Sequence, residues 1–226
     1  MRQRDTAARG PASVEPLVWG GVVGPIVFVA VFLVLGAVRP GYEPLRHQVS
    51  YLSLGDGGWV QTASFLVTGV LVLAFATSLR RLLIGGVGAT GIPVTVGSIG
   101  AGLVIAGLFP TMPAFGYPPG TPNAFPTDIP PSAYVHVAGA FAFFGGMIGA
   151  PLVTARRFRR TSDPGWARLS IAATIAVLIF FSASSADPSG RPFVPALAGL
   201  FQRLAIVAGL GWMAVFAGSI IGGRLR

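Results

Sequence analysis

The chain has 226 residues, of which 53% are hydrophobic and only 10% are charged, and its mean hydropathy is +0.72. Because a soluble domain carries roughly 25% charged residues, this composition excludes a soluble globular protein and indicates that lipid is the solvent. The net charge of +9 comes from arginines clustered between apolar runs, which is typical of membrane topology signals. We therefore expect membrane lipids as partners and no nucleic acid. The absence of cysteine excludes disulfides and thiolate metal sites.

The chain begins with a polar, arginine-containing segment, residues 1–16, which we predict to be cytoplasmic. The apolar run after it is too long for a signal-peptide core and lacks a clear small-residue cleavage site, so we interpret it as a retained first span. A spanning helix needs roughly 20 mostly apolar residues. Six segments meet this requirement: Leu17–Val38, Val60–Leu79, Ile92–Phe109, Ala133–Val153, Leu169–Ser185 and Leu204–Gly222. The sequence predicts an all-α membrane protein, a six-helix bundle over 17–222 with a cytoplasmic tail at 223–226.

The distribution of basic residues predicts the orientation of these spans. All sixteen are arginine, which indicates a GC-rich bacterial genome. Twelve lie before the first span, after the second, between the fourth and fifth, or at the C-terminus, and the other four are Arg39, Arg46, Arg191 and Arg203. Because arginine-rich loops stay in the cytoplasm, we predict a multi-pass protein of the cell membrane with both termini inside.

The first outer loop, from Arg39 to Gln61, is rich in charges, hydroxyls and aromatic rings. From Pro44 onward it fits a short helix whose apolar and polar positions form neighbouring stripes. The stripes are Leu45, Val49 and Leu52 on one side and Arg46, Ser50 and Ser53 on the other. This pattern predicts a short interfacial helix with its apolar side toward lipid or protein.

Two further outer loops are predicted. Residues 110–132 hold many prolines, which remove backbone donors and exclude a regular helix, so we expect this loop to pack across the outer mouth of the bundle. Residues 187–203 could hold another short interfacial helix.

The two histidines, His47 and His136, are both predicted at the outer leaflet. A metal pair and a general base are the functional interpretations. A zinc site with two histidines and no cysteine needs carboxylates, and the spacing matches no standard metal motif. We therefore expect hydrogen-bonded histidines, no metal and no cofactor.

A catalytic set could combine Ser185 as nucleophile, His136 as base and Asp187 as the orienting group, if the fold brings them together. The alternative is structural. Serines at a helix end commonly bond to backbone carbonyls, and Asp187 could pair with Arg191 or Arg203.

Arg46 and Arg203 are predicted on the outer side, against the general trend of the arginines. There they could hold a lipid phosphate or a carboxylate through two hydrogen bonds, or form ion pairs with Glu43 and Asp187. Taken together, the polar residues at the outer leaflet predict a binding site for a lipid or small molecule. Its candidate residues are Arg46, His47, Ser50, His136, Asp187 and Arg203.

A family resemblance rests mainly on the first outer loop and its flanks. Its residues are Gly24-Pro25, Arg39-Pro40-Gly41-Tyr42, Leu45-Arg46-His47, Val49-Ser50, Leu52, Gly55, Gly58-Trp59-Val60-Gln61, Phe65 and Gly69, with His136 and Arg203 further on. With these residues the chain resembles the bacterial and archaeal membrane family catalogued as domain of unknown function 998. The resemblance covers nearly the whole chain and implies a six-span membrane protein. It assigns no catalytic residues.

Four functions stay open, of which a transporter is the weakest, because the midplane of every predicted helix is apolar and argues against an ion or proton path. We favour ligand binding at the outer leaflet. A membrane-embedded hydrolase acting on a lipid-like substrate is the second, and a fainter similarity to hydrolases of the alkaline-ceramidase type bears on it. The chain departs from that type, because it lacks paired histidines within one helix and has six predicted spans where those enzymes have seven. The third is a non-catalytic scaffold or partner subunit, suggested by spaced glycine pairs such as Gly145 and Gly149, which suit close helix contacts within a bundle or between copies.

Overall fold

The computed structural model describes residues 15–159, 163–185 and 196–223. Most of the predicted cytoplasmic segments 1–16 and 223–226 lie outside the described residues. So do two residues of the third outer loop, Asp187 and Arg191, together with the ion pairs predicted for them.

Helices dominate the described chain. They are α1 (Glu15–Val18), α2 (Gly20–Val38), α3 (Trp59–Leu82), α4 (Gly91–Leu108), α5 (Pro131–Phe158), α6 (Pro164–Ser185) and α7 (Ala198–Ile221), with a short 3-10 helix, η2, at Val49–Ser53. Six spans are long and apolar enough to cross a membrane, α1 and α2 together forming the first over Pro16–Val38. The predicted six-helix membrane fold is confirmed. The largest difference is at α7, which begins at Ala198 and not at Leu204, because the helix takes in Arg203 as a buried residue.

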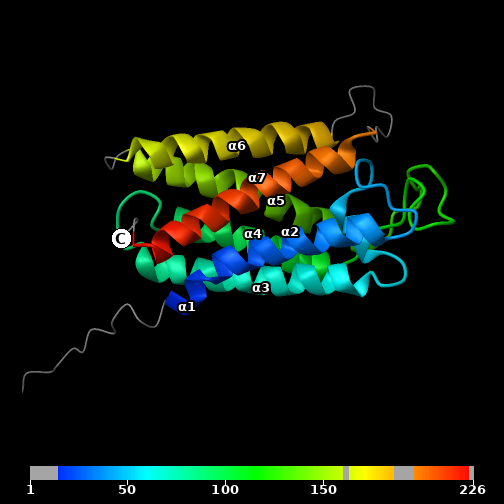
Figure 1. Ribbon diagram of the computed structural model, residues 1–226, viewed down its shortest axis with the longest axis horizontal. Coiled ribbons are helices and arrows are strands. Elements are labelled where there is room, and N and C mark those ends of the chain that lie inside the picture. The colour runs from blue at the N-terminus through cyan, green and yellow to red at the C-terminus, as the bar shows by residue number, and fades with distance from the viewer. Residues whose placement is uncertain (1–14, 160–162, 186–195, 224–226) are drawn as a thin grey trace, which may run out of the picture.

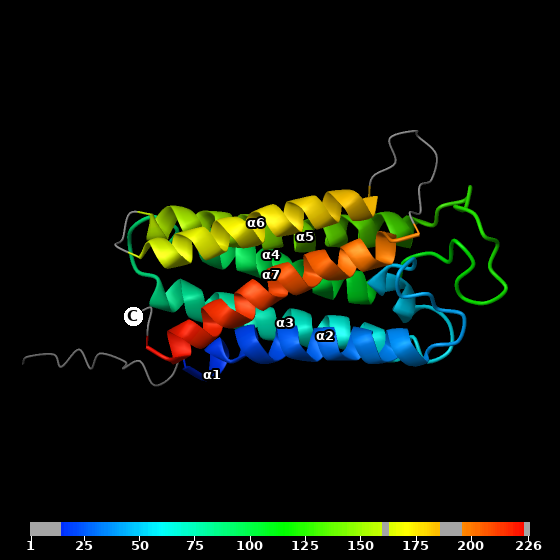
Figure 2. The ribbon, with the colours of Figure 1, turned by 45° about the horizontal axis from the view of Figure 1, so that its top comes forward.

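The six long helices form a closed ring in chain order, in which each packs against the next and α7 returns to α2 (Figures 1 and 2). The first and last described residues, Glu15 and Gly223, lie at the same end of this bundle. The segments 39–58 and 109–130 lie at the opposite end, which we call the loop end. The short connection 83–90 lies at the terminal end, with the C-terminal end of α5 and the start of α6.

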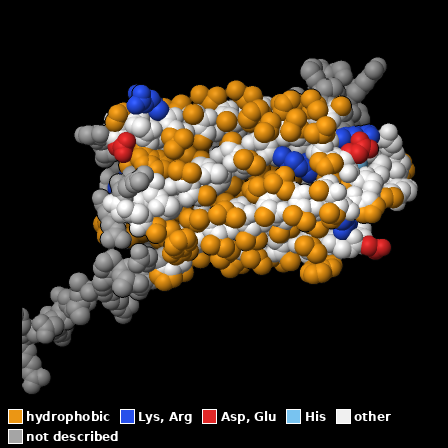
Figure 3. Space-filling model, in the orientation of Figure 1, with side chains coloured by type: hydrophobic (Ala, Val, Ile, Leu, Met, Phe, Trp, Pro, Cys, Tyr) orange, Lys and Arg blue, Asp and Glu red, His pale blue; other side chains and the backbone are white. Residues whose placement is uncertain are grey.

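Apolar side chains fill the interior and cover the flanks. The largest buried ones include Phe28, Phe32, Phe75, Met147 and Leu210, from four different helices. Figure 3 shows hydrophobic side chains over most of the visible flank, while the acidic side chains in view lie at the two ends. A bundle that is apolar both inside and out is what a lipid environment requires.

Close helix contacts depend on glycine, as expected in lipid, where no hydrophobic force drives the helices together and small residues let their backbones approach. A Cβ on Gly102 of α4 would lie 2.5 Å from the carbonyl oxygen of Gly139 on α5, so the two backbones touch. A Cβ on Gly20 would lie even closer, 2.2 Å from the carbonyl oxygen of Leu71 on α3, which places this contact within the bundle. Gly145 and Gly218, by contrast, have open space where a Cβ would point.

Candidate functional site

The first loop is fastened to the start of α7. The first amides of a helix have no partner within it, and here loop carbonyls fill that role. Gly199 N–H donates to Arg46 O at 3.1 Å, and Leu200 N–H donates to Leu45 O at 2.9 Å. The absence of a side chain at Gly199 permits this approach, because a Cβ there would lie 2.4 Å from the carbonyl oxygen of His47.

Arg203, one turn further along α7, completes this attachment. Its Nη1 donates to the carbonyl oxygens of Pro44 at 2.5 Å, His47 at 3.0 Å and Gly199 at 2.9 Å. Its Nη2 donates to the hydroxyl of Tyr42, whose ring also lies against the guanidinium. The side chain is only 8% exposed. The carbonyl dipoles therefore stabilise the buried positive charge of Arg203, which is directed at the backbone of the first loop.

His47 is held in one tautomer. Its Nδ1 accepts a hydrogen bond from Glu43 N–H at 3.0 Å, so in the neutral ring Nε2 carries the hydrogen and donates to Phe115 O at 3.1 Å. The side chain is 2% exposed, and burial lowers its pKa below the ordinary value of 6.5. With both nitrogens occupied, neutral His47 ties the two outer segments together and has no lone pair left for a ligand.

Around His47, three tyrosines form what we call the aromatic cap: Tyr42, Tyr51 and Tyr117, with ring centroids 5.5 to 6.0 Å from the His47 ring. Arg39 Nε donates to the Tyr117 hydroxyl at 3.1 Å. Burial raises the pKa values of Tyr42 and Tyr51 to about 12. These hydroxyls therefore stay protonated, and the cap closes the loop end with neutral rings between two arginines.

The short helix of the first loop differs in extent from the predicted one. It is a single stretch of 3-10 helix that begins at Val49, and the residues from Pro44 to His47 form a turn. Val49 and Leu52 are buried in the protein, whereas Leu45 is 54% exposed. The turn is favoured because its carbonyls meet Arg203 and the α7 amides. Val49 N–H donates to Gln202 Oε1 at 2.8 Å.

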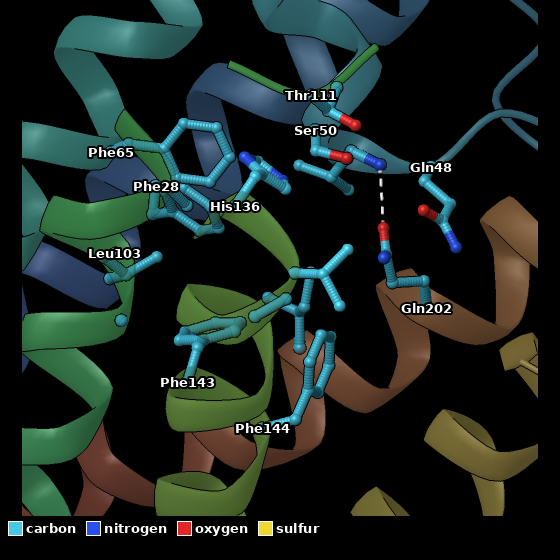
Figure 4. Close-up of a pocket in the computed structure, with 16 residues that line it drawn as sticks. Phe28, Gln48, Ser50, Phe65, Leu103, Thr111, His136, Phe143, Phe144 and Gln202 are labelled. Atoms are coloured by element: carbon cyan, nitrogen blue, oxygen red, sulfur yellow. Dashed lines mark hydrogen bonds between the residues drawn. The ribbon is translucent and has the colours of Figure 1, made fainter. Parts of the chain in front are cut away.

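Below η2 lies a cavity of about 110 Å³, lined by α5 and α7 and also by residues of α2, α3 and α4 (Figure 4). Its polar side chains lie toward η2 and the second loop: Gln48, Ser50, Thr111, His136 and Gln202. Its deeper wall is apolar and mostly aromatic: Phe28, Phe65, Leu103, Phe143, Phe144 and Ile206. Such a volume holds several water molecules, at about 10–15 Å³ for each, or a small polar group with a few carbons.

His136 points one nitrogen toward this space. It lies on the second turn of α5, where its ring packs edge-on against Phe65. Nδ1 donates to Phe109 O at 2.8 Å, at the end of α4. In this tautomer Nε2 carries a lone pair, so the residues that line the cavity include a hydrogen-bond acceptor as well as the hydroxyls of Ser50 and Thr111.

The structure brings some of the predicted site residues together and separates others. Ser50 and His136 line the cavity. His47 and Arg203 meet at the loop attachment instead. Arg46 contacts the Asn123 side chain at the surface. Ser185 is exposed at the last residue of α6, outside the cavity lining, and Asp187 lies outside the described residues.

A family comparison covers both the cavity and the cap. The family model described as "Protein of unknown function (DUF998)" matches residues 22–219. The chain belongs to this family. No curated protein and no solved structure matches the chain.

In this DUF998 protein, several residues that carried the sequence resemblance are explained by the scaffold. Arg39, Tyr42, His47 and Arg203 hold the two outer segments on the bundle through the bonds described above. Ser50 and His136 lie in the cavity and place polar atoms there.

Sequence reasoning missed four polar residues of this DUF998 protein. Gln48, Thr111 and Gln202 line the cavity, but uncharged side chains in the first outer loop or close to the end of a predicted span gave no signal. Gln61 is fully buried on α3, and among the described residues neither its Oε1 nor its Nε2 has a hydrogen-bond partner. Its signal was available, because an amide at the start of an apolar span is unusual.

Proposed function

We propose that the protein binds a lipid or another small molecule in the cavity between α5, α7 and η2. One observation carries the proposal: polar side chains and aromatic side chains line the same cavity at the loop end. Cavities with mostly apolar walls and a few convergent polar groups are typical ligand sites, and bundle helices are a usual place for them.

The polar side chains of the cavity support the proposal because some of their donors and acceptors have no partner within the part of the protein that the structure describes. His47 and Arg203 have all their described bonds within the scaffold. The hydroxyls of Ser50 and Thr111, in contrast, make no hydrogen bond to any described residue. Polar groups at membrane depth are costly unless they have partners, and a bound ligand supplies such partners.

We further propose that the protein lies in the cell membrane with both termini in the cytoplasm, so that the loop end faces outward. The arginine distribution supports this orientation. The chain has no cysteine, so single cysteines can be placed at Asp56 in the first loop and at Ile84 at the terminal end, both exposed. A membrane-impermeant maleimide added to intact cells should label Asp56→Cys and leave Ile84→Cys unlabelled. Labelling of Ile84→Cys but not of Asp56→Cys would show that the loop end faces the cytoplasm.

Ligand binding is tested with a variant that fills the cavity. Ala140 lines it, whereas Ala138, two residues earlier on α5, is exposed. Wild type, Ala140→Phe and the control Ala138→Phe would be purified from membranes, extracted and analysed by mass spectrometry. We expect a molecule that is retained by wild type and control and depleted in Ala140→Phe. Equal content in all three would contradict the proposal and favour a scaffold role.

Hydrolysis of a lipid-like substrate is the second candidate, because Ser50 and His136 share the cavity. His136 Nε2 could accept a proton from a serine hydroxyl, with Phe109 O holding the ring. A fluorophosphonate probe would test this. Labelling lost in Ser50→Ala but kept in Ser185→Ala supports hydrolysis at the cavity. Labelling lost only in Ser185→Ala would move the nucleophile to the end of α6, and no labelling of wild type would count against a serine hydrolase.

A further inference from the structure

The charge of the cavity wall restricts the ligand's head group. Among the described residues that line the cavity there is no Asp, Glu or Arg. The nearest strong charge along the chain belongs to Arg203, the neighbour of Gln202, and its guanidinium is directed at the carbonyls of Pro44 and His47. A charged head group would therefore enter a largely apolar space without a counter-ion, and burying an unpaired charge is very unfavourable.

The hydrogen-bonding groups of the wall are complementary to a hydroxyl. His136 offers an acceptor at Nε2, since Nδ1 donates to Phe109 O. Gln202 Oε1 accepts from Val49 N–H, which leaves its amide N–H₂ as a donor. Ser50 adds a hydroxyl that can donate or accept. A neutral alcohol could donate to His136 and accept from Gln202 or Ser50.

The cavity also borders the lipid-facing side of α5. Tyr134, Val137 and Phe141 are 62%, 50% and 65% exposed, and their spacing places them on one helix face. Val137 belongs to this face and to the cavity wall as well. A molecule dissolved in the adjoining leaflet can therefore reach the cavity past Val137. The volume of about 110 Å³ holds a head group with only a few carbons, so a longer chain must remain in the lipid.

We propose that the cavity takes the uncharged hydroxyl head of a membrane-dissolved amphiphile, which enters sideways past Val137 with His136 Nε2 as its acceptor. This inference rests on the proposed function, because it names the ligand class of the same site. It excludes phospholipid head groups and fatty-acid anions as preferred ligands.

The test uses the full-length protein in phosphatidylcholine nanodiscs and four photoreactive probes. The probes share one diazirine-bearing dodecyl chain and differ in the head: an alcohol, its methyl ether, a sulfonate and a trimethylammonium. Cross-linked residues are mapped by mass spectrometry at equal mole fractions in the bilayer. We expect the alcohol to label peptides around Val137 and Phe143, with labelling by the ether about tenfold lower because it cannot donate to His136. The two charged probes should label least.

Three variants separate the possible failures. Ala140→Phe should abolish the labelling of these peptides, and Ala138→Phe should not. If a charged probe labels the cavity best and Ala140→Phe blocks it, the neutral class is wrong and ligand binding stands. If Ala140→Phe blocks no probe, the cavity does not bind amphiphiles and this inference fails; the proposed function fails as well only if the ligand content of purified Ala140→Phe also equals that of wild type. In His136→Phe, the preference for alcohol over ether should fall to about one; a preserved preference would remove His136 as the acceptor.

Discussion

Gln202 Oε1 accepts a hydrogen bond from Val49 N–H at 2.8 Å, so a single side chain of α7 holds η2 above the cavity (Figure 4). The interaction links residues 153 positions apart in the sequence. Replacing Gln202 with leucine leaves the buried Val49 amide without a partner. We expect Gln202→Leu to lower the free energy of unfolding by about 1–3 kcal/mol, measured as a lower melting temperature in detergent.

Gln61 should respond in the opposite direction. It is buried more completely than Gln202, but its Oε1 and Nε2 have no partner among the described residues. Replacing unsatisfied polar atoms by an apolar group of similar shape is neutral or stabilising. Gln61→Leu should therefore leave the melting temperature unchanged or raise it. A clear decrease would show that the Gln61 amide has a bound partner, which would make it a second functional residue.

The attachment of Arg203 depends on its fork of donors. Lysine keeps the charge but cannot reach the carbonyls of Pro44 and His47 and the Tyr42 hydroxyl together. We expect Arg203→Lys to cost about 2–3 kcal/mol of stability. The matched control is Arg46→Lys, because Arg46 makes its side-chain contact at the surface; its effect should stay within about 0.5 kcal/mol. If both substitutions lowered the stability equally, the bonds of Arg203 to the first loop would not be what stabilises the protein.

Gly199 should tolerate no side chain. A Cβ there would lie 2.4 Å from His47 O and 2.6 Å from Pro44 O, so the first loop would have to move off α7. We expect Gly199→Ala to cost about 2 kcal/mol or more. Gly211 is the control on the same helix, because no atom lies within 4 Å of the site of its Cβ. Gly211→Ala should be neutral or stabilise by about 0.5–1 kcal/mol, the usual helix preference.

Acid should weaken the loop end through His47. Burial lowers its folded pKa below 6.5, so the unfolded chain takes up a proton at a higher pH than the folded protein does. Stability from this group is therefore full above about pH 6.5, falls as the pH drops below that value, and is lost completely below the lowered pKa. The charges facing His47 oppose one another, because Glu43 favours protonation while Arg46 and Arg203 disfavour it.

The measurement is the melting temperature between about pH 8 and about pH 5. Wild type should lose stability toward acid. His47→Gln should be less stable than wild type at the upper pH, because Glu43 N–H and Phe115 O lose their shared partner, and its dependence on pH should be weaker. An unchanged pH slope in His47→Gln would assign the acid sensitivity to another group.

The sequence by itself determined the membrane fold. Long apolar runs have few stable arrangements in lipid, since each backbone group must be bonded within its own helix, and six such runs predict the six helices found. The ends of these apolar runs predict the ends of the helices less accurately. Residues 198–203 looked like loop because Arg203 is charged, and only loop carbonyls brought from residues 44 and 47 make its burial in α7 possible.

Only the tertiary structure decided which outer polar residues belong together. His47 and His136 look alike in the sequence, yet the first has both nitrogens bonded and the second keeps a lone pair at the cavity. The cavity itself arises where five helices, α2, α3, α4, α5 and α7, meet beneath η2. Its amides at Gln48 and Gln202 carry no charge that a sequence pattern could reveal. Spacing along a chain reports helix faces, but the meeting of loops 60 or more residues apart depends on packing, which no local pattern encodes.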